Sequence, residues 1–109
     1  MIGLINQHQE AMRALCQTYG VRRLDLFGSA ATGAFDPATS DLDFVATFAG
    51  TEAPDYAERF LAFAEALEAL IDRPVDLVID RSIRKPSFRR AVDATRQPIY
   101  DDRDAPAAA

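Results

Sequence analysis

The 109-residue chain has a single cysteine, no tryptophan and no long hydrophobic run. The single cysteine, Cys16, excludes an internal disulfide and a zinc site built from several cysteines, and we interpret it as a small buried hydrophobe of a reduced, cytoplasmic protein. No apolar stretch approaches the roughly 18 residues that a membrane span requires. The opening residues, MIGLINQH, lack the basic start and apolar core of a signal peptide. The sequence therefore predicts one cytoplasmic domain with no membrane segment.

Basic residues are also few. The chain has 17 acidic and 12 basic residues, a net charge of −5 and a pI near 4.7, which argues against direct binding to nucleic acid because such binding needs a basic face. The exception is the segment 81–96, which holds six basic residues and one acidic residue. We interpret this basic segment as a platform for phosphates or for an acidic patch of a partner. The alternative is a solvated helix face.

The hydrophobic pattern alternates between helical and strand periodicity. It predicts helices over residues 4–19, about 54–71 and 86–95, a short helical turn at 30–33, and strands over 21–27, 42–48, 75–80 and 98–100. Pro54 is expected near the first position of its helix. This order predicts an α/β fold in which a small mixed β-sheet carries helices packed on one side. The domain is expected to span residues 1–100, followed by a disordered C-terminal tail at 101–109.

A glycine and a serine, Gly28 and Ser29, stand at the corner between the first strand and the short helical turn. Glycine lets a ligand approach the backbone closely. The free N–H groups of the turn that follows, together with its dipole, attract anions. Taken alone, such a pair is typical of an ordinary turn, so its value as a phosphate site depends on the acidic residues that follow.

Two acidic residues, Asp41 and Asp43, begin the otherwise apolar strand 42–48. Positions i and i+2 of a strand point the same way, so both carboxylates share one face, roughly 6–7 Å apart. Like charges so placed repel each other, and a divalent cation converts that repulsion into binding. Carboxylate oxygens combined with substrate phosphates are the ligands that Mg²⁺ prefers. The alternative is an acidic strand end that faces solvent.

A third acidic residue, Asp76, interrupts the apolar run VDLVI of residues 75–79. Burying it unpaired would be costly, so it must be exposed, paired or at a metal. A phosphate-binding corner with a carboxylate pair and a third carboxylate on another strand is the set of groups needed for two-metal nucleotidyl transfer, in which Asp76 serves as ligand or base. Asp25, just before the corner, is either a neighbour of this site or a surface acid.

These residues carry a family resemblance. The run Leu26–Ser29, followed by eleven residues and then Asp41-Leu42-Asp43, resembles the signature of the polymerase-beta-like nucleotidyltransferase superfamily, most closely its minimal nucleotidyltransferase (MNT) branch, over about residues 4–100. The resemblance implies the two-layer nucleotidyltransferase fold, with ATP as substrate and two Mg²⁺ ions when the nucleotide is bound. It implies that Gly28 and Ser29 bind the nucleotide and that Asp41, Asp43 and Asp76 are catalytic metal ligands.

Many MNT proteins are antitoxins that silence a HEPN-domain ribonuclease toxin by adenylylating a tyrosine. The resemblance thus implies AMP transfer from ATP to a hydroxyl of a HEPN-like helical toxin, expected to be encoded next door. Two departures stand out: the spacing to Asp41 is eleven residues where ten is usual, and Thr32 occupies a position that is commonly arginine. The departure at Thr32 favours one alternative, a binding module that neutralises its partner by contact. Transfer to a small molecule is the other alternative, but such relatives use a second domain that this chain lacks.

Overall fold

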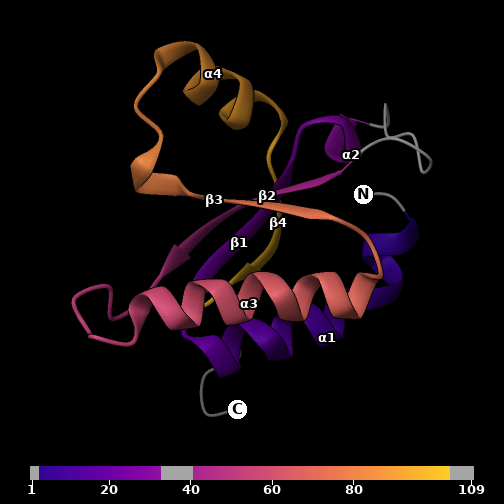
Figure 1. Cartoon of the computed structure of the whole chain (residues 1–109). Helices are drawn as coiled ribbons and strands as arrows, with labels where there is room; N and C mark the ends of the chain where they lie inside the picture. The colour runs from indigo at the N-terminus through magenta and orange to yellow at the C-terminus, as the bar shows by residue number, and fades with distance from the viewer. Residues whose placement is uncertain (1–2, 33–40, 104–109) are drawn as a thin grey trace.

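The computed structural model describes residues 3–32 and 41–103 (Figure 1). Residue 33 of the predicted helical turn, the connection 34–40 that follows it and residues 104–109 of the predicted tail lie outside the described residues. The elements follow in the order α1 (Gly3–Tyr19), β1 (Val21–Phe27), α2 (Ser29–Thr32), β2 (Leu42–Phe48), α3 (Tyr56–Ile71), β3 (Val75–Ile79), the 3₁₀ turn η1 (Asp80–Ser82), α4 (Pro86–Thr95) and β4 (Gln97–Asp101). No helix in the described ranges is long and apolar enough to cross a membrane.

The four strands form one mixed sheet in the order β3-β2-β1-β4. The central strand β1 is antiparallel to both of its neighbours, β2 and β4, whereas β2 and β3 are parallel. A parallel pair needs a long crossover connection, and α3 supplies it. The prediction of a small mixed sheet with packed helices is confirmed.

The main core lies between the sheet and the two long helices, α1 and α3, which lie side by side on one face (Figure 1). Alternate residues of β2 enter this core, as their spacing predicts: Leu42, Phe44, Ala46 and Phe48. Met12 from α1 and Phe63 from α3 are fully buried against them. Cys16 is buried in the same layer, and the loss of hydration raises the pKa of its thiol to about 12, so it packs as a hydrophobe rather than reacting.

The opposite face of the sheet, which we call the open face, carries a smaller apolar cluster. Phe27 of β1, Val45 of β2 and Val92 of α4 are buried together there. The short helix α4 therefore lies across the sheet from α1 and α3 (Figure 1). The predicted packing of helices on one side describes the two long helices, and α4 covers part of the other face.

Some element boundaries differ from those predicted. α3 begins at Tyr56 rather than near Pro54 because the preceding residues form turns. Arg59 holds these turns by donating to the backbone oxygens of Ala49 and Gly50. At the other end of the chain, β4 continues to Asp101, so the sheet extends into the segment predicted as tail.

Candidate functional site

The corner after β1 has room for a carboxylate because residue 28 is glycine. Gly28 has a φ of +75°, in the left-handed region that L side chains rarely adopt. A Cβ added to Gly28 would lie 2.7 Å from Oδ2 of Asp43, closer than any carbon tolerates. The absent side chain thus brings the glycine–serine corner into direct contact with the carboxylate pair, two motifs that are well separated in sequence.

Some backbone amides of this corner donate hydrogen bonds within the fold, and others have no acceptor in it. The amides of Ala31 and Thr32 donate to the oxygen of Gly28, and the Gly28 amide donates to Oγ1 of Thr95 on α4 over 3.0 Å. The amides of Ser29 and Ala30 have no acceptor among the described residues. Ser29 is half-buried, so its N–H group is available to an anion at the start of α2, whereas Ala30 is buried.

The strand register gathers the carboxylates on the open face. Asp43 pairs with Phe27 across the antiparallel β1–β2 ladder and with Asp76 across the parallel β2–β3 ladder. Side chains paired in adjacent strands point to the same face, so Asp43 and Asp76 are direct neighbours. Asp41 is exposed immediately before β2. The structure therefore brings Asp43 and Asp76 to one place, beside Gly28.

Asp43 lies between two other carboxylates, and its burial and their negative charges act on its pKa. Burial raises the pKa of the Asp43 carboxyl, and the negative charges of Asp76 and then Asp41 raise it further. Each cause opposes ionisation of Asp43. A bound cation would remove the repulsion, which is the electrostatic property expected of a metal site rather than of an ordinary surface.

The donor set fits Mg²⁺ that is shared with a nucleotide. All three candidates offer hard oxygen atoms, and two of them, Asp41 and Asp76, are exposed to an incoming ligand. Within the described part of the chain, no three acidic, histidine or cysteine side chains converge closely enough to hold an ion by themselves. Mg²⁺ usually binds one or two carboxylates and completes its shell with water and substrate phosphates, so the arrangement suits a site that needs the nucleotide.

Asp25 has a role that the sequence left open. It is fully buried, the sole charged residue so buried in the described chain, and it pairs with Arg96 over 2.5 Å and with Arg23 over 2.9 Å. Asp25 is therefore neither a surface acid nor part of the group formed by Asp41, Asp43 and Asp76. The available signal was an acid enclosed in the apolar run LDLF, which requires a buried partner.

The same arginine links α4 to the turn after β3. Arg96 also pairs with Asp80 over 3.0 Å, and Arg89 pairs with Asp80 over 2.6 Å. Two residues of the basic segment are thus used inside the fold, so the prediction of a platform is too broad. Exposed basic residues with no ion pair among the described residues remain at Arg84, Lys85 and Arg90.

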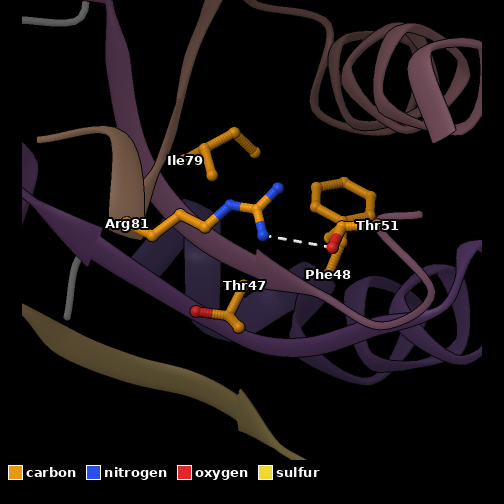
Figure 2. Close-up of a pocket in the computed structure, with 5 residues that line it drawn as sticks. All are labelled: Thr47, Phe48, Thr51, Ile79 and Arg81. Atoms are coloured by element: carbon orange, nitrogen blue, oxygen red, sulfur yellow. Dashed lines mark hydrogen bonds between the residues drawn. The ribbon is translucent and has the colours of Figure 1, made fainter.

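A hollow with about 250 Å³ of space, partly open to solvent, lies near the far end of β2 from Asp43. Figure 2 shows Arg81 reaching across it to Thr51, whose Oγ1 accepts a hydrogen bond of 3.1 Å. The Arg81 guanidinium also lies 5.9 Å from the centroid of the Tyr56 ring. Arg81 is therefore committed to this hollow, away from the carboxylates.

Replacing Gly28 by alanine should destabilise the fold and abolish any function of the corner. The positive φ alone costs about 1–2 kcal/mol for an L residue, and the new Cβ would displace the Asp43 carboxylate. Gly50→Ala is a matched control, since Gly50 has a φ of +60° but faces only the flexible end of Arg59, 3.3 Å away. Urea unfolding should show a loss for both variants, with loss of nucleotide binding for Gly28→Ala alone. Normal binding by Gly28→Ala would contradict the contact.

Three comparisons extend this geometry. A family model, the nucleotidyltransferase domain, matches residues 8–98. A protein of Methanocaldococcus jannaschii named "putative protein adenylyltransferase" is 28% identical over 90 residues, which are 83% of this chain and 85% of that protein. A solved structure described as a "putative minimal nucleotidyltransferase" has a TM-score of 0.73 and 29% identity, and covers 89% of this chain and 96% of the other.

A more distant solved structure is described as a tri-AMPylated Shewanella oneidensis HEPN toxin in complex with MNT antitoxin. It has a TM-score of 0.61 and 19% identity, and the match covers 88% of this chain and 71% of that one. At this identity the likeness shows the fold alone. Together with the family match, it agrees with the two-layer fold that the family resemblance implied.

Proposed function

Because the chain belongs to the nucleotidyltransferase domain family, we propose that it transfers AMP from ATP to a tyrosine hydroxyl of a HEPN-like helical toxin, as its antitoxin. The observation that carries this proposal is the contact between the two halves of the motif. Gly28 leaves space for the Asp43 carboxylate, and Asp43 is paired with Asp76 on the next strand. Phosphate-binding and acidic groups thus meet at one point on the open face.

The chain's own groups would hold the triphosphate at the corner. The amide of Ser29 would donate to a phosphate oxygen, with the Ser29 hydroxyl beside it. The Gly28 amide is held by Thr95, so it fixes the turn rather than binding the ligand. Mg²⁺ held by Asp41, Asp43 and Asp76 would supply positive charge opposite the phosphates.

The reaction itself exchanges one bond for another. The acceptor oxygen forms a bond to the α-phosphorus as the bond from that phosphorus to the pyrophosphate oxygen breaks, and pyrophosphate leaves. The acceptor's proton passes to a carboxylate, and Asp76 suits this role because it is exposed on the side from which an acceptor can approach. Asp43 is more enclosed and is better placed to bind than to exchange protons with solvent.

The form of the partner follows from what the open face lacks. In the described chain, α4 is the one helix of several turns on this face, and it leaves Asp41 and Asp76 exposed. A macromolecular acceptor would cover these carboxylates with its own surface. The exposed bases Arg84, Lys85 and Arg90 lie on or just before α4 and would attract an acidic patch of that partner, raising the association rate at low salt.

The test is co-expression with the helical protein that we expect to be encoded next to this gene, followed by mass spectrometry of that neighbour. We expect its mass to increase by one or more AMP residues, located on tyrosine, in the presence of the wild-type chain. The increase should be absent with an Asp41→Asn/Asp43→Asn double variant. An unmodified neighbour in both samples would contradict the proposed transfer.

A second function, neutralisation by contact, is favoured by one observation. Thr32 stands where related proteins commonly carry arginine, and its hydroxyl donates to the oxygen of Ser29 over 3.2 Å, so it stabilises α2 rather than a phosphate. If the double variant still protects cells from the neighbour and no AMP is ever found, contact inhibition replaces transfer. Detection of AMP on a small molecule instead would point to the remaining alternative.

A further inference from the structure

Phe88, on α4, leaves 37% of its surface exposed. Among the described residues, the one other large hydrophobic side chain that is similarly open is Leu61, at 60% exposure. Leu61 lies on α3, in the layer on the opposite side of the sheet from α4. Phe88 is thus the exposed large hydrophobic group on the face that carries the carboxylates. An aromatic ring left more than a third exposed there is a candidate ligand contact.

Phe88 is connected to the site through a single ring. Its centroid lies 5.9 Å from that of Phe27, with the two planes inclined at 71°. Phe27 precedes Gly28 in the chain and pairs with Asp43 across the β1–β2 ladder. The exposed ring therefore lies one side chain away from both the glycine–serine corner and the central carboxylate.

Helix α4 holds this ring in a fixed place. Phe88, Val92 and Thr95 are spaced by four and three residues, so they share one face of the helix. Val92 is buried against Phe27 and Val45, and Thr95 accepts the hydrogen bond from the Gly28 amide. The ion pairs of Arg96 fasten the end of the helix to β1. A ligand contact on Phe88 would therefore require little ordering, which favours affinity.

We infer that Phe88 stacks against the base of the bound nucleotide and that the site consequently prefers purine nucleoside triphosphates. This inference rests on the proposed function, since phosphates held at Ser29 would direct the rest of the nucleotide outward over the open face. The edge-to-face contact with Phe27 occupies part of the Phe88 ring and leaves the exposed remainder to a planar group. Stacking tolerates different bases but gains from the larger purine face, so ATP and GTP should bind better than CTP and UTP.

The absence of tryptophan provides a direct optical test. Phe88→Trp would introduce the only indole of the chain at the proposed contact. We expect its fluorescence to be quenched by Mg-ATP and Mg-GTP, and to change little with inorganic tripolyphosphate plus Mg²⁺, which carries no base. Equal quenching by tripolyphosphate would overturn the inference, because the signal would then report the phosphates alone.

Calorimetry on Phe88→Ala supplies the energetic test. Removing a stacking ring should weaken Mg-ATP binding roughly 5- to 150-fold and leave tripolyphosphate binding unchanged, while Phe88→Tyr retains wild-type affinity. Leu61→Ala, which truncates the more exposed hydrophobic side chain on α3, should change neither. Unchanged ATP affinity in Phe88→Ala, or equal loss for both ligands, would refute stacking while the proposed transfer stands. Failure of the wild-type chain to bind Mg-ATP would instead refute the proposed function, and the inference with it.

Discussion

Replacing Asp43 by asparagine should reduce nucleotidyl transfer by about 10³-fold, because a bound metal ion contributes several kcal/mol of transition-state charge stabilisation and about 4 kcal/mol corresponds to that factor. Asp43 is the carboxylate shared by both halves of the site, since it contacts Gly28 and pairs with Asp76. Asparagine keeps the shape and one oxygen but loses the charge that a cation requires. Single-turnover transfer of labelled AMP to the partner, measured with saturating Mg-ATP, reports the loss.

The same change should leave the fold as stable or more stable at neutral pH. Because the pKa of Asp43 is raised, the folded protein binds more protons than the unfolded chain between the two pKa values, and the free energy of unfolding falls as the pH rises through that window. Above the window the wild type carries the full penalty of the charged group, whereas the neutral amide of the variant would carry none. The advantage of Asp43→Asn should therefore vanish below the ordinary carboxyl pKa of 3.8.

A suitable control for Asp43→Asn is Glu58→Gln, which removes an exposed acid near the start of α3, where Tyr56 packs on Phe48 at the end of β2 opposite to Asp43. We expect it to leave transfer unchanged. Clear destabilisation by Asp43→Asn at pH 7 would show that the carboxylate has a structural role, and the interpretation as a metal ligand would then be wrong.

The largest loss of stability should follow from Arg96→Met. Asp25 has no exposed surface, and in this variant it would retain Arg23 alone. Removing one member of a buried ion pair typically costs about 3–5 kcal/mol because the remaining charge is poorly compensated. Since a whole domain is stable by only about 5–15 kcal/mol, urea unfolding followed by circular dichroism should show a greatly lowered midpoint.

Two further variants separate the buried pair from a general effect of charge. Arg90 lies on the same helix, is exposed and has no ion pair among the described residues. Arg90→Met should therefore change the free energy of unfolding by less than about 0.5 kcal/mol. Asp25→Leu/Arg96→Met removes both charges, and it should be more stable than Arg96→Met because no buried charge is left. If the double variant is the less stable of the two, a poorly compensated charge on Asp25 is not the cause of the loss in Arg96→Met.

The parts of the fold that local sequence determines were predicted well. The bounds of β1, β2 and α4 agree with the prediction because strand alternation and Pro86 at a helix start are local signals. The start of α3 was placed near Pro54, two residues early, because the turns that precede Tyr56 depend on Arg59, whose contacts reach back to the oxygen of Tyr19. That contact spans 40 residues and leaves no local pattern.

In the candidate site, too, local spacing could be predicted from the sequence, whereas contacts with distant partners could not. Spacing alone placed Asp41 and Asp43 together, and the register now pairs Asp43 with Asp76. The role of Asp25 could not be read, because its partner Arg96 is 71 residues away. Arg89 and Arg96 were interpreted as part of an available basic surface for the same reason: net charge along a segment does not reveal which acids fold against it.

The long separation of these partners also bears on how the protein is made. Asp25 and the Gly28 amide emerge early in synthesis, yet their partners Arg96 and Thr95 follow 71 and 67 residues later, and β1 lacks one neighbour until β4 is complete. At about 5–20 residues per second, the nascent chain spends several seconds without them. During this time the nascent chain would have a sheet without β4 and a Gly28–Ser29 corner without its hydrogen bond to Thr95. Activity should begin only once the chain has been made as far as Asp101, so interrupted translation yields inert fragments rather than partly active ones.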